Sequence, residues 1–497
     1  MGYLSGLDRS QMGIWSLDDM VLPDSTVRII DSFVDKIDLT ELGFTRTGSK
    51  STGRPGYPAD VLVKLYVYGY ENGVRSSRKL EVECQRNIEV MWLTGKMTPD
   101  YKTISEFRRQ NIEPLQKLFR LFVLILRYWD LIEGSMLVID GTKIKASNNK
   151  KKNFSQKKLK RLLAQIDKQI AEWLDTTESN DLAESAASDV TDSLNKILER
   201  KEIYEGLLSK LEQLDENEVS LVDPDARLMG NNRGGVDMAY NVQSTADALK
   251  DFIVDFDVSK NPSDQGQLDN MTKRLKDQGY SDFTVLADKG YHNGKDLEAC
   301  EEREILAIVA RQSFAGPKGR SSQFHIKCFT YDINTDSYLC PNGATLDAHS
   351  AKKTKRRKFY NKQACADCEY LKECVGNDET EYRVIKRDEY ADVRDRAEAI
   401  YEDNKELYRL RQQKIEHPFG TIKHTMNGGY FLLRTEQKVR CEVALLLLGY
   451  NIKRAISVLG FEEIMARIES LPSLLGCLLL HHFEPFTITT RINLLAA

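Results

Sequence analysis

The segment Met136-Leu-Val-Ile-Asp140-Gly-Thr142 is the clearest strand pattern in this chain. A short apolar run followed by an acid and a turn residue predicts a buried strand that ends on a carboxylate. Phe283-Thr-Val-Leu-Ala-Asp288-Lys-Gly-Tyr291 repeats the pattern, and a third acid, Glu416, lies in a stretch of helical character. An acid after a strand often only caps the next turn, so each of the three is weak support for a site when taken alone.

The segments between Asp140 and Asp288 predict a mixed sheet. Alternating apolar residues over 236–242 and 252–258 predict a hairpin with one covered face. The pattern then predicts a helix that starts at Asn261-Pro-Ser-Asp264 and runs to about Lys276, the strand ending at Asp288, a helix from about Gly294 and a strand over 305–310. The first strand must return beside the fourth to bring the two acids together. We therefore expect an α/β fold, with a mixed five-stranded sheet and flanking helices.

Residues 1–130 predict an all-helical N-terminal domain. Asn72-Gly73 ends one helix, Ser77 can begin the next, and Thr103 with Glu106 predicts a capping box. Short helices joined by a glycine turn resemble a helix-turn-helix array with basic edges that meet DNA phosphates. An ordinary bundle with solvated charges explains the pattern equally well. The basic residues in question are Arg75, Arg78, Lys79, Arg86, Arg108 and Arg109.

Two insertions divide the expected sheet domain into residues 131–150, 220–315 and 395–460. Residues 151–219 carry apolar side chains at helical spacing among many Lys and Glu, which predicts an antiparallel helical hairpin. Its use would be DNA contact or dimerisation, and a solvated strut is the alternative. Residues 316–394 form a polar, Cys-rich insertion. A long helix containing Glu416 is expected from about residue 395, and the tail, 461–497, carries no motif.

The length and net charge of the chain limit the class of protein to which it can belong. A chain of 497 residues suggests about three domain-sized pieces. Lys and Arg number 71 against 75 Asp and Glu, a net charge of -4, so a nucleic-acid surface must be local. The N-terminus does not resemble a signal peptide, and no apolar run reaches the roughly 20 residues of a membrane span. We expect a cytoplasmic protein without a membrane partner.

The cysteines suggest a metal site. Of nine, Cys340, Cys365, Cys368 and Cys374 are gathered in the polar insertion. A turn of the type Cys-Pro-Asn-Gly followed by a CxxC pair suits tetrahedral structural zinc. Free reduced thiols are the alternative, and Cys328 or His325 could replace one ligand.

A dense basic run lies between the two halves of this cysteine set. It spans residues 352–358 and includes Arg356, Arg357 and Lys358, followed by aromatic residues. Such runs are usually solvated, but one held in a small metal module can clamp a phosphate backbone.

The three acids suit phosphodiester chemistry. Two divalent ions roughly 3.5–4 Å apart can hold the attacking and leaving oxygens, and carboxylates are the ligands that magnesium prefers. Asp140 would bridge the ions, and Asp288 and Glu416 would each complete one site. Lys423, seven residues after Glu416, would lie on the same helix face and meet a DNA phosphate, although Pro418 should bend the helix between them.

Taken together, several strings resemble the DDE transposases of bacterial insertion sequences, over about residues 50–460. They are Arg54-Pro-Gly-Tyr-Pro58, Pro99-Asp-Tyr-Lys-Thr-Ile-Ser-Glu-Phe-Arg108, Val138-Ile-Asp-Gly-Thr142, Ala239-Tyr-Asn-Val-Gln243, Ala287-Asp-Lys-Gly-Tyr291 and Ile415-Glu-His-Pro-Phe-Gly-Thr-Ile-Lys423.

The resemblance implies a ribonuclease-H-like catalytic domain with Asp140, Asp288 and Glu416 as its triad. It also implies two Mg²⁺ or Mn²⁺ ions, cleavage at the ends of a mobile element, and attack of the freed 3′ hydroxyl on target DNA. Bringing two ends together implies a homodimer on DNA, associated with the nucleoid. Many relatives have Tyr and Arg at fixed intervals before the last acid; here Tyr408 and Arg411 stand one position early, and both remain candidate DNA contacts.

Two other functions stay open from the sequence. One is a transposase-derived DNA-binding protein that no longer catalyses, and the other is a nuclease on the same fold that cuts without joining.

Overall fold

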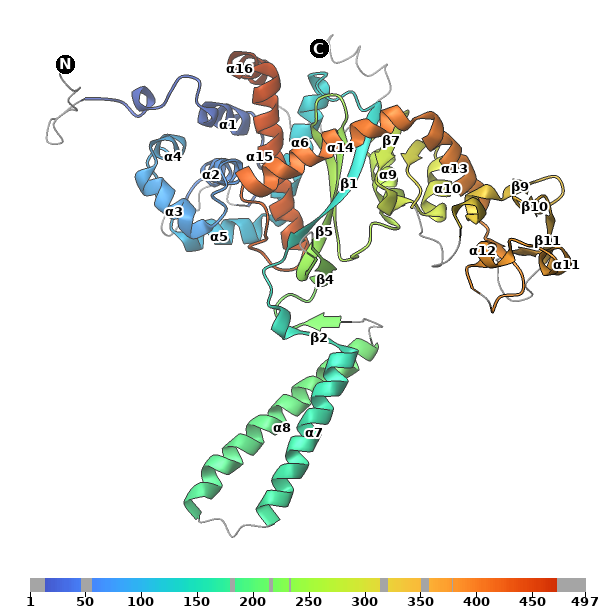
Figure 1. Cartoon of the computed structure of the whole chain (residues 1–497). Coiled ribbons are helices and arrows are strands. Elements are labelled where there is room, and N and C mark those ends of the chain that lie inside the picture. The colour runs from blue at the N-terminus through green and yellow to red at the C-terminus, as the bar shows by residue number, and fades with distance from the viewer. Residues whose placement is uncertain are drawn as a thin grey trace, which may run out of the picture.

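A computed structural model describes residues 14–45, 56–178, 184–213, 218–231, 234–312, 321–349, 357–377 and 379–471. A six-stranded sheet flanked by helices forms the main body, and a helical hairpin and a small β-module project from it (Figure 1).

The main sheet has the strand order β4-β5-β1-β7-β8, and β6 pairs with β5. β1 runs antiparallel to β5 and parallel to β7, which is parallel to β8. The predicted β-hairpin, the pairing of the Asp140 strand with the strand before Asp288, and the mixed α/β class are confirmed. The sheet has six strands and not the expected five, because the short strand β4 adds to β5. The strands are β1 (Met136–Lys145), β4 (Arg227–Gly230), β5 (Val236–Asp247), β6 (Ile253–Ser259), β7 (Thr284–Ala287) and β8 (Leu306–Val309).

The register between β1 and β7 places the first two acids side by side. Ile139 of β1 lies opposite Ala287 of β7. The residue that follows each of them is an acid, Asp140 after Ile139 and Asp288 after Ala287. The expectation that the first strand ends at Asp140 is wrong, because β1 continues to Lys145 along the twelve-residue strand β5. β7 ends at Ala287, so only Asp288 follows a strand end.

One hydrophobic core joins the sheet to the N-terminal helices. Helices α2 (Ala59–Glu71) and α6 (Ile112–Tyr128) pack on α15 (Glu436–Leu459), and α6 and α15 both contact β6. A Cβ on Gly449 of α15 would stand 3.0 Å from the Cα of Glu71, so glycine lets these two helices approach closely. The remaining helices of this body are α1 (Thr26–Asp35), α3 (Ser77–Arg86), α4 (Ile88–Leu93), α5 (Tyr101–Gln110), α9 (Gln267–Asp277), α10 (Gly294–Glu302) and α16 (Phe461–Glu469).

Helices α1, α4 and α5 of the N-terminal region begin at a small polar residue whose side chain accepts a hydrogen bond from a first-turn amide. The break at Asn72-Gly73 and the helix start at Ser77 are confirmed. The capping box at Thr103 is wrong: the helix begins earlier, and Asp100 caps it by accepting a hydrogen bond of 2.9 Å from the Thr103 amide. Asp100 thus pairs with the Thr103 amide, which the predicted capping box would have paired with Glu106.

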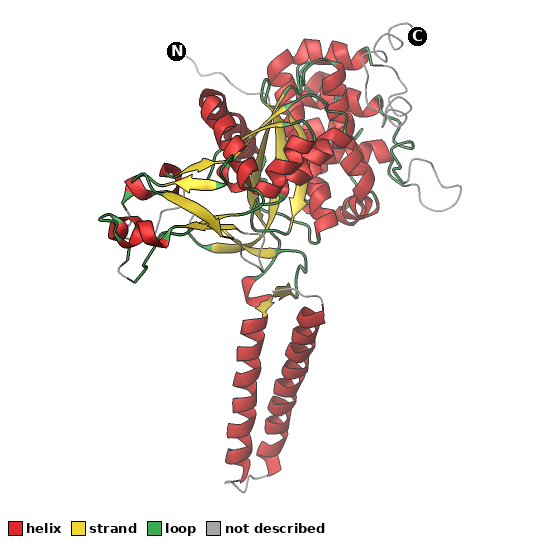
Figure 2. Cartoon of the chain, turned by 90° about the vertical axis from the view of Figure 1, so that its right-hand side faces the viewer, coloured by secondary structure: helices red, strands yellow, loops and turns green. Residues whose placement is uncertain are grey.

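The helical hairpin stands away from the main body (Figures 1 and 2). It consists of α7 (Gln156–Glu178) and α8 (Glu184–Gln213), closed at its base by the short pair β2 (Asn153–Ser155) and β3 (Glu218–Ser220). A small separate core of Phe154, Leu159, Leu211 and Val219 holds this base together.

The segment that looked merely polar contains a second sheet, the β-module, with the order β13-β12-β11-β10-β9. Its strands have only three to five residues, which leaves too little alternation for a sequence pattern. The module has its own small core. Its elements are β9 (Thr330–Asp332), β10 (Ser337–Leu339), β11 (Thr345–His349), β12 (Arg357–Tyr360), α11 (Lys362–Ala366), α12 (Leu371–Val375) and β13 (Ile385–Arg387).

The expected single helix from about residue 395 is in fact two. α13 (Ala391–Asp403) ends at Asn404, whose side-chain amide donates to the Ile400 carbonyl, and α14 (Lys405–Gly420) follows. Pro418 lies inside the last turn of α14, and the next turn, Thr421–Thr425, widens to a π-helix. A proline ring crowds the preceding turn and removes a donor, so the wider turn takes up the distortion.

Among the described residues, no single helix is long and apolar enough to span a membrane. α15 and α16 meet that test only as a pair, and they are bent by 111° at their junction.

Candidate active site

Asp140 and Asp288 share one cation in this structure. The Arg411 guanidinium lies 3.8 Å from the Asp140 carboxylate and 3.3 Å from that of Asp288. Arg411 comes from α14, which contacts both β1 and β7 and crosses them in Figure 1. The site is therefore built from two neighbouring strands and one helix that is distant in sequence.

The environment of Asp140 disfavours its negative charge. Burial raises the pKa of Asp140 to about 6, and the carboxylates of Asp288 and Asp264 act in the same direction. The Gly141 amide, which donates to Asp140 Oδ1 at 2.8 Å, and the Arg411 guanidinium oppose this rise. A pair of acids held this close needs a positive charge between them.

The third predicted acid lies on the helix that crosses the pair. Glu416 is in α14, five residues after Arg411, and its side chain falls outside the described part of the structure. Tyr408 lies on the same helix, with the Arg411 guanidinium 5.5 Å from the centre of its ring. Arg411 thus reaches the acids although it stands one position early in the sequence.

Lys423 also belongs to this site. It lies on the π-helical turn, and its ammonium group donates a hydrogen bond to the Thr142 hydroxyl on β1. Burial lowers the pKa of Lys423, and Asp140 partly offsets that effect. Lys423 is therefore a cation held close to Asp140 and only partly exposed.

The sequence pattern missed a fourth carboxylate, Asp264. We expected Asn261-Pro-Ser-Asp264 to begin a helix, but α9 starts only at Gln267. Asp264 Oδ1 instead accepts hydrogen bonds from the side-chain amides of Asn241 at 2.8 Å and Gln243 at 2.9 Å. The Tyr291 hydroxyl donates to the other end of Gln243.

Two glycines next to the acids make room for Asp264. A Cβ on Gly141 would stand 2.6 Å from Asp264 Oδ1, and one on Gly290 would stand 3.4 Å from Asp264 Oδ2. The sequence feature that could have pointed to Asp264 lies in β5, where Asn241 and Gln243 are polar residues on a buried strand. Buried amides require partners, and Asp264 supplies the acceptor.

Of the six basic residues expected at the edges of the N-terminal helices, Arg75 and Arg108 are excluded as DNA contacts by their burial. The Arg108 side chain is buried, stacks 5.4 Å from the centre of the Tyr66 ring and donates to the Tyr70 hydroxyl. That burial contradicts a phosphate contact, because the guanidinium does not reach the surface. Arg109 is exposed and pairs with Glu106.

The basic run of the β-module is only partly described. Arg356 lies outside the described residues, while Arg357 and Lys358 are exposed on β12. Arg357 pairs with Asp336 at 2.8 Å, so Lys358 carries the less compensated charge.

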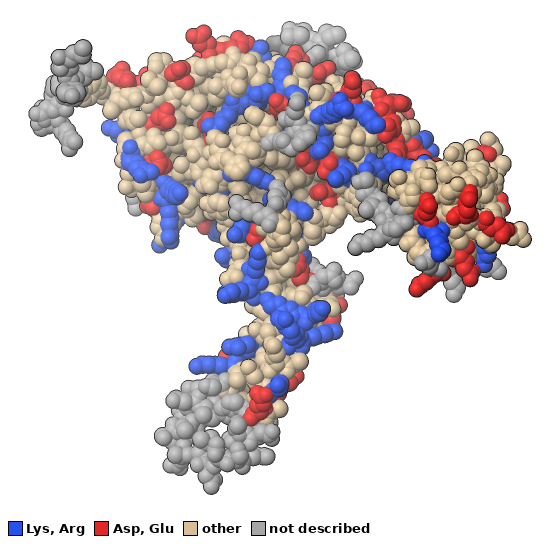
Figure 3. Space-filling model, viewed as in Figure 1, with Lys and Arg blue, Asp and Glu red and all other residues tan. Residues whose placement is uncertain are grey.

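A larger group of basic residues surrounds the base of the helical hairpin. Figure 3 shows Lys and Arg side chains gathered there, below the main body. This basic patch begins on β1, a few residues after Asp140, and continues along α7. Its exposed members are Lys143, Lys145, Lys150, Lys151, Lys152, Lys157, Lys160 and Arg161.

The four gathered cysteines, Cys340, Cys365, Cys368 and Cys374, line a single cavity in the β-module. Cys328 and His325, the alternative ligands, are not in its wall.

Comparison with known families identifies two domains. Residues 15–110 match a transposase domain (DUF772), and residues 339–456 match a transposase DDE domain. No curated protein matches the chain. A cryo-EM structure of the piggyBac transposase synaptic complex with hairpin DNA is similar over 94% of this chain and 84% of that one. Its identity is 9% and its TM-score 0.33, too low to support an argument.

The two domain matches fall on different parts of the structure. The first covers α1 to α5, and the second runs from the β-module through α14, the helix of Arg411 and Glu416, into α15. With a transposase domain and a transposase DDE domain, the chain functions as a DNA transposase, an enzyme that cleaves DNA and transfers the cut strand.

Proposed function

We propose that this chain is the transposase of a bacterial insertion sequence, with Asp140, Asp288 and Glu416 as its catalytic carboxylates. One observation carries the proposal: Asp140 and Asp288 are neighbours across β1 and β7 and already share a cation. The strand order β6-β5-β1-β7-β8, with only β5 antiparallel to β1 and its parallel neighbours, supports the ribonuclease-H-like assignment.

The acids fit a divalent cation. Carboxylate oxygens are ligands that suit Mg²⁺ or Mn²⁺. In this structure the Arg411 guanidinium supplies the positive charge between Asp140 and Asp288. When bound, two such ions supply the charge that stabilises the attacking and leaving oxygens of a phosphodiester. Asp140, Asp288 and Glu416 hold them, and Arg411 withdraws from the acids to a DNA phosphate, beside Tyr408.

The remaining cations orient DNA at this site. Lys423 holds the Thr142 hydroxyl next to Asp140 and meets the phosphate near the cut. The basic patch at the base of the hairpin extends this contact away from the acids, with Arg109, Arg357 and Lys358 as further contacts. A homodimer in the cytoplasm, assembled on two element ends, completes the proposal.

The deciding experiment uses the DNA that flanks the gene. Purified full-length protein is incubated in Mg²⁺ with labelled fragments of both flanks and a plasmid target. We expect cuts at the outer ends of the element and products joined to the plasmid through a 3′ hydroxyl.

Fragments with scrambled flanks serve as the control and should give neither product. Cut fragments without joined products would make the protein a nuclease, and binding without cuts would make it a DNA-binding remnant.

Asp264 acts as a positioning residue, because it holds Asn241 and Gln243 against the strand that carries Asp140. We expect Asp264→Ala to lower the cleavage rate by about 10–100-fold, the usual effect of removing a residue that supports a metal site from outside its ligands. Asp264→Asn keeps an acceptor oxygen for the two amides and should retain more activity.

The readout that isolates positioning is the Mg²⁺ concentration at half-maximal cleavage, which should rise in Asp264→Ala. Asp277→Asn, on an exposed residue at the far end of α9, is the matched control. An unchanged Mg²⁺ requirement in Asp264→Ala would rule out this role.

A further inference from the structure

We infer that the β-module holds a structural zinc ion bound by the thiolates of Cys340, Cys365, Cys368 and Cys374. Neither matched domain nor the cleavage reaction assigns such a site. The inference is independent of the proposed active site, which lies on other elements of the fold.

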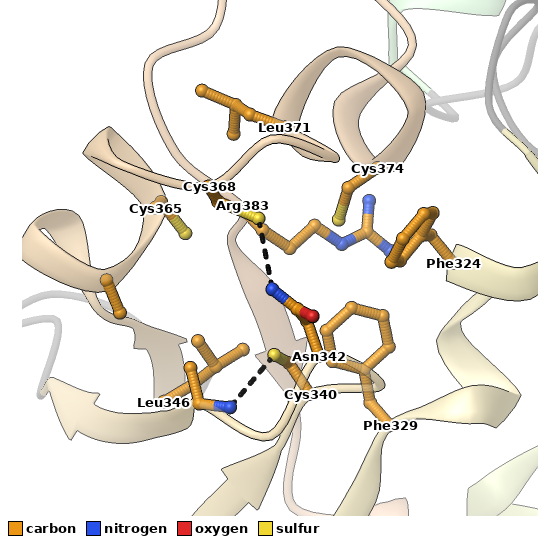
Figure 4. A pocket seen from close by; sticks show the side chains of 12 residues that line it. Phe324, Phe329, Cys340, Asn342, Leu346, Cys365, Cys368, Leu371, Cys374 and Arg383 are labelled. Carbon is orange, nitrogen blue, oxygen red and sulfur yellow. Dashed lines mark hydrogen bonds between the residues drawn. The ribbon is translucent and has the colours of Figure 1, made fainter.

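The four cysteines come from three separate elements and face one space. Cys340 follows β10, Cys365 lies on α11, Cys368 follows it, and Cys374 lies on α12. Figure 4 shows the four cysteines around one pocket, with the Asn342 side chain between Cys340 and Cys368. The cavity between them measures about 30 Å³, room for one small species.

The local backbone is shaped around the sulfur atoms. After Cys340 the chain turns through Gly343, at a φ of +81°, and the Ala344 amide donates to Cys340 Sγ at 3.3 Å. The Asn342 side-chain amide lies 3.7 Å from Cys368 Sγ. Such donors favour the thiolate, which is the form of cysteine that binds metal.

The module also needs a stabilising element beyond its core. Its own core contains only seven buried residues, and its strands have three to five residues each. Domains this small usually rely on disulfides or a metal. The described cysteines form no disulfide, so their sulfur atoms are available as metal ligands.

Binding of zinc would draw the four sulfur atoms closer together, because they are not yet at metal-binding distances. Across the described ranges, no three His, Cys, Asp or Glu side chains are already drawn together as a bound metal would hold them. Zinc binds four thiolates tetrahedrally at about 2.3 Å, so the four sulfur atoms must each move inward. The cavity wall offers the right number and kind of ligands for that closure.

Metal content of the full-length protein is the first test. Protein purified without chelator should contain about one equivalent of zinc per chain, and Co²⁺ exchanged for zinc should give the absorption of a tetrahedral thiolate site. Less than about half an equivalent, or a Co²⁺ spectrum without thiolate bands, would overturn the inference in favour of free thiols. This test needs no variant to fold.

The ligand set is tested with paired cysteine variants. Cys365→Ser should reduce bound zinc well below one equivalent and lower the melting temperature. Cys328→Ser changes an exposed cysteine of the same module that lies outside the cavity wall, and it should keep the zinc. Equal zinc loss in both variants, or full zinc in Cys365→Ser, would contradict the assignment. Neither result bears on Asp140 or Asp288, so the proposed cleavage reaction is judged separately.

Discussion

Asp140→Asn and Asp288→Asn each lower the rate of DNA cleavage in Mg²⁺ by about 10³-fold, because metal-assisted charge stabilisation contributes several kcal/mol to this chemistry. Asparagine keeps the size of aspartate, and at position 140 its oxygen can still accept from the Gly141 amide. The change therefore removes charge with little change of shape. Cleavage of labelled element ends measures the effect.

DNA binding separates a catalytic loss from a folding loss. Both variants should bind the element ends as wild type does, because neither acid is proposed to contact phosphate directly. Asp282→Asn, an exposed residue just before β7, is the matched control and should cleave normally. Near-normal cleavage by either active-site variant would remove that acid from the proposed triad.

Arg75→Met is expected to destabilise the whole fold by about 3–5 kcal/mol, the usual effect of leaving one member of a buried ion pair alone. Arg75 lies between α2 and α3, and its guanidinium is 2.7 Å from the Glu442 carboxylate on α15. Both side chains are at most 1% exposed. Arg75 also donates to the carbonyls of Tyr430 and Asn427, in the loop that follows the turn of Lys423.

The loss should depend on pH. Burial raises the pKa of Glu442, and Arg75 lowers it in part, so removing Arg75 raises it further. A carboxyl with a raised pKa in the folded state takes up a proton on folding. The Arg75→Met variant therefore loses stability, relative to the wild type, as pH rises above the ordinary Glu pKa of about 4.3. Thermal unfolding at pH 5 and pH 8 should show the larger deficit at pH 8.

Two further variants define the cause. Arg75→Met combined with Glu442→Gln should recover part of the stability, because the unpaired charge is gone. Lys79→Met, on an exposed position of α3, should change stability by less than about 0.5 kcal/mol. No recovery in the double variant would mean that the contacts of Arg75 to the loop carbonyls, and not the ion pair, account for its stabilising effect.

The expectations that depended on periodicity were confirmed for the positions of the elements, but not for all of their ends. The strand at Asp140, the hairpin after it, the strand before Asp288 and a helix through Glu416 all lie where the apolar pattern predicted them. Long elements with one covered face repeat their pattern several times, so a few polar exceptions do not hide them. The five short strands of the β-module repeat theirs once at most, and the sequence pattern did not predict them.

The expectations about which basic side chains are exposed were less accurate. Arg75 and Arg108 looked like the other basic residues of the N-terminal helices, yet both are buried, one against Glu442 and the other between two tyrosines. An arginine on a helix is solvated unless a distant element supplies a partner for its charge. In this fold α15 supplies Glu442, and the sequence does not indicate where that helix packs.

The sequence by itself determined the long elements of the main sheet and the residue types that chemistry needs, because local periodicity follows from local side chains. Only the tertiary structure decided which of these residues meet. It placed Asp288 beside Asp140, brought Arg411 between them and added Asp264 from a loop that looked like a helix start. These contacts depend on strand register and helix packing, which join residues far apart in the chain, and no local pattern records them.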